Sequence, residues 1–223
     1  MDTDTAKAQE VVIEETKKFV RKTLENAESG HDWWHILRVY NNAMNIAKTE
    51  KCDKFVVALG ALLHDIADWK FSGSDEEGPK VTREFLTGLK VDEKTIEEVS
   101  YIVKNVSYKG AKAKDGMESL EGKIVQDADR LDAIGAIGIA RTFSYGGHRN
   151  RRMYDPDEKP TMHESFEAYK KNEGTTVNHF YEKLLLLKDR MHTESAKKIA
   201  EDRHKYMEEY LKRFYGEWNG ECQ

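Results

Sequence analysis

The chain has 223 residues, 35% of them charged, and its net charge of −5 disfavours nonspecific nucleic-acid binding, although a local basic patch stays open. We expect no specific nucleic-acid partner. Residues 1–10 lack the apolar core of a secretory signal, and the longest apolar run, Phe55–Leu63, is too short to span a bilayer. Cys52 and Cys222 have no C-x-x-C spacing, so a cytoplasmic protein with reduced thiols and no membrane association is expected.

Apolar residues recur at helical spacing through the first half of the chain. A first helix is predicted over 11–24, and a second begins after Asp32, a favourable N-cap residue. Phe55–Ile66 is apolar on nearly all sides, and its length and its Ala and Leu content favour a buried helix over a strand. The Ser-, Gly- and Asp-containing stretch 68–78 is predicted to be a loop.

The second half continues this pattern with one interruption. Further helices are predicted over 81–89, 93–106, 119–134, 135–143, 176–189 and 193–215. The pattern breaks in an irregular excursion near 144–175, which contains Gly146-Gly147, a basic run and two prolines. Such segments in compact domains are usually functional or disordered. No strand-like alternation occurs, so we expect an all-α fold, a single domain over 1–223 with about eight to ten helices.

Histidine and aspartate stand at long gaps within three motifs, H-x-x-R-V, A-L-L-H-D-I-A-D and D-A-D-R-L. Imidazoles and carboxylates hold hard or borderline divalent metals. The candidate ligands are His35, His64, Asp65 and Asp129. They belong to separate segments, which we expect to converge on one point, as a rigid metal site requires. Together the motifs resemble the HD-domain superfamily of metal-dependent phosphohydrolases, in particular a bacterial and archaeal subgroup of predicted HD hydrolases of similar length.

The resemblance implies an HD-type helical bundle with one divalent ion, held by two histidines and two aspartates. Water or substrate would take the remaining positions. The ion could be Mn, Mg, Fe, Co, Ni or Zn, since mixed imidazole and carboxylate ligation admits all of them. The chain has no histidine between His64 and His148, the interval from which two-metal members take further ligands. A single-metal site is therefore favoured.

Two positions have a local alternative. His31-Asp32 is also an H-D doublet, but H-x-x-R-V begins at His35; Asp32 then acts as a cap, and His31 would lie behind a ligand or near substrate. Asp127 and Asp129 point about 200° apart on a helix, so both cannot easily face one ion. The A-D-x-L match favours Asp129, leaving Asp127 a structural or supporting role.

Asp68 completes an H-D-x-x-D pattern that resembles H-D-x-x-E/D of mononuclear nucleotidases and alarmone hydrolases, whose carboxylate positions or activates water. Asp68 could equally cap the loop that begins there, and both interpretations stay open. L-D-A-I replaces the alarmone hydrolases' L-H-N-M, which disfavours alarmone cleavage. Candidate substrate contacts are His31, Lys70, Arg141, Arg149 and Lys183. Arginine suits bidentate phosphate capture, whereas Lys183, predicted to share a helical face with His179, could be an ordinary helix residue.

The function implied by the resemblance is hydrolysis of a nucleotide or another small phosphorylated molecule by metal-activated water. Nucleoside-triphosphate pyrophosphohydrolysis is one form of that activity. The alternative is a degenerate HD module that binds nucleotide as a sensor, against which the intact ligand set argues. A diiron oxygenase would need the further histidines that are absent. The oligomeric state is left open, because the four tryptophans suit an interface as well as a core.

Overall fold

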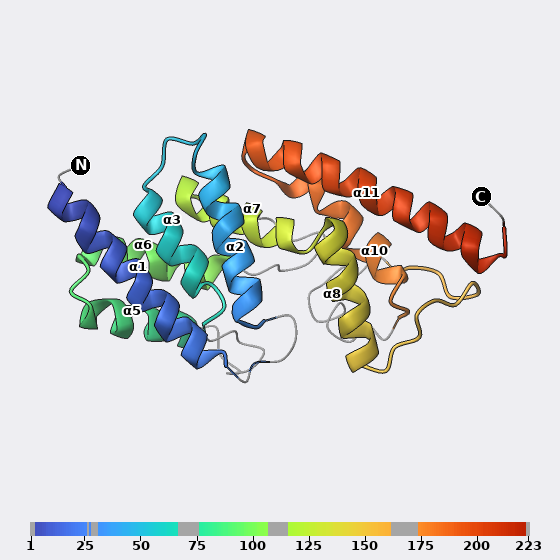
Figure 1. The fold of residues 1–223 in the computed structure, drawn as a ribbon, viewed down its shortest axis with the longest axis horizontal. Helices are drawn as coiled ribbons and strands as arrows, with labels where there is room; N and C mark the ends of the chain where they lie inside the picture. The colour runs from blue at the N-terminus through green and yellow to red at the C-terminus, as the bar shows by residue number, and fades with distance from the viewer. Residues whose placement is uncertain are drawn as a thin grey trace. The chain divides into compact units, whose positions relative to one another are not determined.

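The computed structural model describes residues 3–25, 27, 31–66, 76–106, 116–161 and 174–221. These residues form α-helices and short 3-10 helices and contain no strand, which confirms the all-α prediction (Figure 1). The α-helices are α1 (Thr3–Thr23), α2 (Trp33–Ile46), α3 (Lys54–Leu63), α5 (Glu77–Gly88), α6 (Glu93–Asn105), α7 (Leu120–Asp132), α8 (Gly135–His148), α10 (Asn178–Glu182) and α11 (Glu194–Trp218). The 3-10 helices are η1 (Leu184–Leu186) and η2 (Lys188–Arg190).

The chain forms two compact units. The first comprises Met1–Tyr108 with Asp115–Asp129, and the second comprises Lys109–Lys114 with Arg130–Gln223. Helix α7 passes from the first unit to the second after Asp129. That the whole chain works as one domain stays a prediction.

Helix α3 is the core of the first unit. Phe55–Leu63 is buried throughout, as its all-round apolar sequence predicts, and α3 packs against α1, α2 and α6. The carboxylate of Asp53 begins the helix by accepting from the backbone N–H of Phe55 at 2.9 Å. Complete burial of a Leu or Phe side chain stabilises a fold by about 1.5–3 kcal/mol. The packing of this helix therefore fixes the position of the residues at its C-terminal end.

The second unit is built around an aromatic cluster. Helices α8 and α11 pack together (Figure 1). The aromatic rings gathered on and beside these two helices have centroids 5.0 to 6.4 Å apart. The cluster consists of Phe143, Tyr154, Phe180, Tyr210, Phe214, Tyr215 and Trp218. Tyr210, Phe214 and Trp218 follow one another at intervals of four on α11, which places them on one face.

Several helix boundaries differ from the sequence prediction. Helix α1 begins at Thr3 rather than at residue 11, and α5 begins at Glu77 rather than 81, within the stretch predicted to be a loop. The helix expected over 176–189 is instead α10 followed by η1 and η2, because Lys183 leaves the helical region with φ −143° and ψ −58°. Helix α8 continues to His148 rather than 143, so the irregular segment begins five residues beyond Ser144, and residues 162–173 lie outside the described part.

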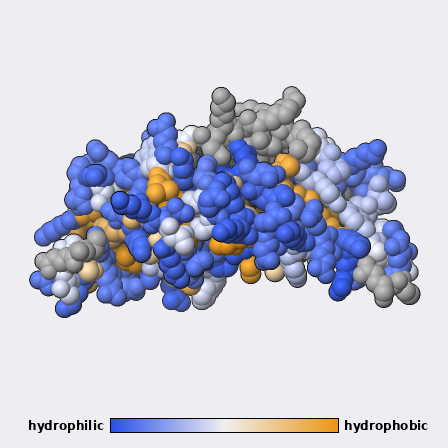
Figure 2. Space-filling view, turned by 90° about the horizontal axis from the view of Figure 1, so that it is seen from above, coloured by the Kyte–Doolittle hydropathy of each residue, from blue (hydrophilic) through white to orange (hydrophobic). Residues whose placement is uncertain are grey.

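Among the described residues, no helix combines the length and apolar character needed to cross a membrane. The face drawn in Figure 2 is largely hydrophilic, with small separate hydrophobic areas.

Candidate metal centre

Two helix ends and one helix interior bring the predicted ligands together in the first unit. His35 lies in the first turn of α2, where the N-cap Asp32 accepts from the backbone N–H of His35 at 2.9 Å, confirming the predicted cap. His64 is the C-cap residue of α3, and Asp65 follows it. Asp129 lies on α7.

Hydrogen bonds between neighbouring helices fix where α7 runs. The side-chain amide of Asn42 on α2 donates to the carbonyl of Ala128 at 3.5 Å. The amide of Gln126 donates to the carbonyl of Val106, the C-cap residue of α6, at 3.2 Å. These bonds hold the stretch next to Asp129 against α2 and α6.

The Nε2 atom of His35 is at the centre of the group. It lies 3.3 Å from Nε2 of His64, 3.5 Å from Oδ2 of Asp65 and 3.5 Å from Oδ1 of Asp129. His64 Nε2 lies 3.7 and 3.9 Å from the same two oxygens. Two ligands at 2.1 Å from one ion stand about 3.0 Å apart in octahedral and about 3.4 Å apart in tetrahedral geometry. These five separations are close to those between ligands of one ion, and two overlapping groups could hold a metal: His35, His64 and Asp129, and His31, His35 and Asp65.

The tautomer of His64 suits metal binding. Its Nδ1 lies 2.8 Å from the carbonyl oxygen of Ala61, which can only accept, so Nδ1 carries the proton. In the neutral ring, Nε2 then presents its lone pair to the other three candidate ligands. Metal-binding histidines are commonly oriented by such a bond through their other nitrogen.

The carboxylate of Asp65 is held ionised. Burial by itself raises the pKa of Asp65, but the positive charge that His64 and His31 carry when protonated, together with hydrogen bonds from His31 and His35, outweighs it and holds that pKa well below its usual range. A carboxyl group must be deprotonated to bind a metal, so this environment prepares Asp65 as a ligand.

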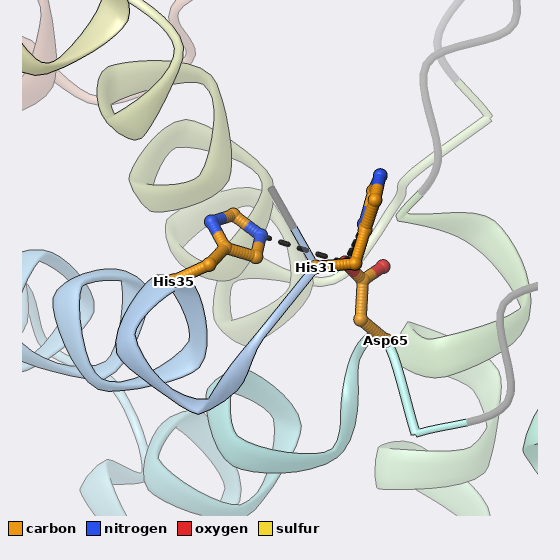
Figure 3. A group of neighbouring side chains, drawn as sticks. All are labelled: His31, His35 and Asp65. Atoms are coloured by element: carbon orange, nitrogen blue, oxygen red, sulfur yellow. Dashed lines mark hydrogen bonds and ion pairs between the residues drawn. The ribbon is translucent and has the colours of Figure 1, made fainter. Parts of the chain in front are cut away.

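His31 also reaches Asp65. Its Nδ1 lies 2.6 Å from Oδ2 of Asp65, and Figure 3 shows the rings of His31 and His35 directed at the same carboxylate. The two rings meet edge to face with their centroids 5.9 Å apart. The sequence placed His31 only in the neighbourhood of ligand or substrate; the bond to Asp65, 34 residues away, leaves no signal in the sequence.

Three further candidate residues, Asp127, Asp68 and Lys70, belong to the first unit by sequence. Asp127 is fully buried and does not belong to the clustered group, whereas Asp129 does. Asp68 and Lys70 lie outside the described residues. The roles of Asp68 as a proton-handling carboxylate and of Lys70 as a phosphate contact therefore stay predictions.

Three candidate substrate contacts belong to the second unit. Arg141 forms an ion pair at 2.7 Å with the buried Asp132, and Arg149 is the exposed C-cap residue of α8. Lys183 is the C-cap residue of α10, and its backbone N–H donates to the carbonyl of His179 at 3.1 Å, one helical turn before it. Its charge acts on His179: burial first, then Lys183 and Arg151, lower the pKa of that imidazole to about 3.

The chain is similar to known proteins in sequence and in fold. The HD domain family matches residues 33–134, a range that includes all four candidate ligands. YpgQ of Bacillus subtilis, an uncharacterized protein, is 36% identical over 201 residues, which cover 89% of this chain and 90% of YpgQ.

Solved structures match over nearly the whole chain. An HD-superfamily hydrolase from Bacillus thuringiensis has a TM-score of 0.76 at 44% identity, covering 95% of this chain and 98% of its own. A Lactobacillus plantarum protein has a TM-score of 0.81 at 35% identity, covering 99% and 100%. Bacillus subtilis YpgQ in complex with ADP has a TM-score of 0.74 at 31% identity, covering 94% and 96%.

Proposed function

The chain belongs to the HD-domain superfamily, and on that premise we propose that it is a metal-dependent phosphohydrolase acting on a nucleotide or another small phosphorylated molecule. The observation that carries this proposal is the spacing of four ligand atoms, with separations of 3.3 to 3.9 Å around His35 and His64. Nothing in an ordinary helical core requires two imidazoles and two carboxylates at such distances.

The chain's own residues would share the work as follows. His35, His64, Asp65 and Asp129 would hold one divalent ion, His64 with its proton kept on Nδ1 and Asp65 kept ionised. When bound, that ion would polarise a phosphoryl oxygen and make a water molecule more acidic. Asp68, three residues after Asp65, is proposed to accept the proton of the attacking water.

A nucleotide is the favoured substrate class. YpgQ, which matches over nearly its full length, was crystallised with ADP. His31, Lys70, Arg141, Arg149 and Lys183 are the proposed substrate contacts, all of them able to donate hydrogen bonds to phosphate oxygens. Cleavage of a nucleoside triphosphate to the monophosphate and pyrophosphate is one activity that this site could perform. The alternative, a sensor that binds nucleotide without cleaving it, would not need a complete ligand set.

Metal analysis combined with a nucleotide panel tests the proposal. We expect the purified protein to hold about one divalent ion per chain and, when loaded with Mn²⁺, to release phosphate or pyrophosphate from at least one nucleoside phosphate. Phosphorus NMR of the products identifies the bond cleaved. Asp129→Ala should lose both metal and activity, while Asp202→Ala, which removes an exposed carboxylate from α11, should keep both.

Two results would contradict the proposal in different ways. If the metal-loaded protein binds nucleotides and releases no product from any of them, the sensor alternative holds. If Asp129→Ala keeps its metal and its activity, the ligand assignment is wrong.

A further inference from the structure

We propose that His31 is a positioning residue for metal binding: its Nδ1–H holds Asp65 with Oδ2 toward the two buried histidines, and His31 is not itself a ligand. This inference rests on the proposed metal site. His31 lies outside the H…HD…D ligand pattern, and the structure alone brings it to Asp65.

The distance between the two groups identifies the contact as a hydrogen bond. His31 Nδ1 and Asp65 Oδ2 are 2.6 Å apart, shorter than the separation of about 3.0 Å between neighbouring ligands of one ion at 2.1 Å. By contrast, Nε2 of His35 and Nε2 of His64 lie 3.3 to 3.9 Å from each other and from the oxygens of Asp65 and Asp129. A metal-binding carboxylate is deprotonated and can only accept, so Nδ1 of His31 must donate.

The oxygen that accepts this bond is the one that faces the other ligands. Oδ2 of Asp65 lies 3.5 Å from Nε2 of His35 and 3.7 Å from Nε2 of His64. A carboxylate oxygen has two lone pairs, so Oδ2 can take the His31 N–H on one and an ion on the other. Rotation of the carboxylate away from the cluster would break the bond to His31, which therefore selects the metal-binding orientation.

The local backbone places His31 for this task. It directly precedes Asp32, whose carboxylate is bonded at 2.9 Å to the backbone N–H of His35. The start of α2 thus carries both a ligand and the residue that orients a second ligand at the end of α3 (Figure 3). This bond links two segments that are distant in sequence and must meet around one ion.

Calorimetric titration of metal-free protein with Mn²⁺ tests the inference without relying on activity. Loss of a hydrogen-bond partner behind a metal ligand typically weakens metal affinity about 10- to 100-fold, and we expect this for His31→Ala. His31→Asn should recover affinity to within about threefold, because its amide N–H can take the place of Nδ1–H. His31→Gln, whose amide lies one bond farther along, should not recover it.

Three outcomes overturn the inference. Unchanged affinity in His31→Ala shows that the bond does not position Asp65. Equal affinities in His31→Asn and His31→Gln, both polar and both tolerable at this partly exposed position, show that donor position is irrelevant. A changed visible spectrum of the Co²⁺-loaded His31→Asn protein relative to the parent shows that His31 is a ligand after all.

The same titration separates this inference from the proposed function. If the parent protein binds no Mn²⁺ and no other divalent ion, both fail together. If the parent binds Mn²⁺ and His31→Ala binds it equally well, only the role of His31 fails, and the four-ligand site stands. His148→Ala, which removes an exposed histidine of α8, is the control and should bind as the parent does.

Discussion

The two units each gather unusual side chains, but by opposite physical means. The metal-binding candidates of the first unit are single polar atoms 3.3 to 3.9 Å apart, placed at the start of α2 and the end of α3 and on α7. The aromatic cluster of the second unit consists of whole rings with centroids 5.0 to 6.4 Å apart, contributed largely by α8 and α11. The candidate metal site depends on which ligand atom occupies each position. The aromatic cluster depends on how much of the interior volume its rings fill.

This contrast predicts how each region responds to mutation. A change of one ligand atom should abolish metal binding while leaving most packing contacts intact. Removal of one ring should cost packing energy without touching any candidate ligand.

The largest effect is expected from His64→Asn. The asparagine amide can still donate to the carbonyl of Ala61, as Nδ1 of His64 does at 2.8 Å, but it offers no atom in place of Nε2. Mn²⁺ affinity should fall by about 1,000-fold or more, beyond the 10- to 100-fold typical of a residue behind the ligands. Calorimetry measures the affinity, and thermal melting of the metal-free protein should shift by only about 2 °C. Wild-type affinity in this variant would contradict the contrast.

The largest loss of stability is expected from Phe180→Ala. Phe180 is fully buried and stacks against Tyr210 with centroids 6.1 Å apart. Truncation should lower the unfolding free energy by about 3 to 4 kcal/mol, measured by urea denaturation. The exposed Tyr206 of α11 is the control, and Tyr206→Ala should change stability by less than about 0.5 kcal/mol. The folded Phe180→Ala protein should keep its Mn²⁺ affinity; loss of affinity would show that the two regions are not separable.

The same contrast explains what the sequence could predict. The candidate metal ligands could be proposed from the sequence because they lie in motifs defined by particular residue types. His64 also lies at the end of a helix that is apolar on all sides. His31 was only half predicted, since its bond to Asp65 joins residues 34 apart and depends on how α2 meets α3. Residue types point to chemistry, but hydrogen bonds between distant segments arise from tertiary structure.

The packing of the second unit was harder to predict from the sequence. The spacing of Tyr210, Phe214 and Trp218 marks one face of α11, yet it does not name the rings that they meet. The broken helix after α10 has a packing explanation: Leu184 and Leu187 are buried, and residues three apart line up on a 3-10 helix. Tertiary contacts there override the helical pattern that the sequence suggests.

A smaller effect, confined to acid conditions, is expected at His179. Its pKa is about 3 in the folded protein and about 6.5 in the unfolded chain. The unfolded state therefore binds more protons between these values, so the stabilising contribution is complete above pH 6.5 and is lost as the pH falls toward 3. His179→Gln should remove a slope of up to about 1.4 kcal/mol per pH unit, measured by urea denaturation between pH 7 and 5.

Lys183→Met provides the matched comparison for that slope. It should leave the slope between pH 7 and 5 nearly unchanged and make the slope end at a higher pH, because loss of the Lys183 charge raises the folded-state pKa of His179 while burial, the larger cause, still holds it below the unfolded value. Urea denaturation continued from pH 5 to 3 measures the difference. Identical slopes in the parent and in His179→Gln would contradict the assignment.

The smallest effect is expected from mutation of two helix caps in the first unit, Asp32 and Asp92. The pair tests whether metal affinity depends on the placement of single atoms or on overall stability. Asp32 accepts from the backbone N–H of His35 at 2.9 Å, and Asp92 accepts from that of Thr95 at 3.1 Å. Each change to Ala should cost about 1 kcal/mol of stability, seen in thermal melts. Only Asp32→Ala loosens a helical turn that carries a ligand, so only this variant should weaken Mn²⁺ binding, by about three- to tenfold, near the lower end of effects seen behind metal ligands. Asp32→Ser, which keeps a cap, should restore it. If Asp92→Ala weakens Mn²⁺ binding as much as Asp32→Ala does, Mn²⁺ affinity depends on the stability of the whole unit and not on the placement of single ligand atoms.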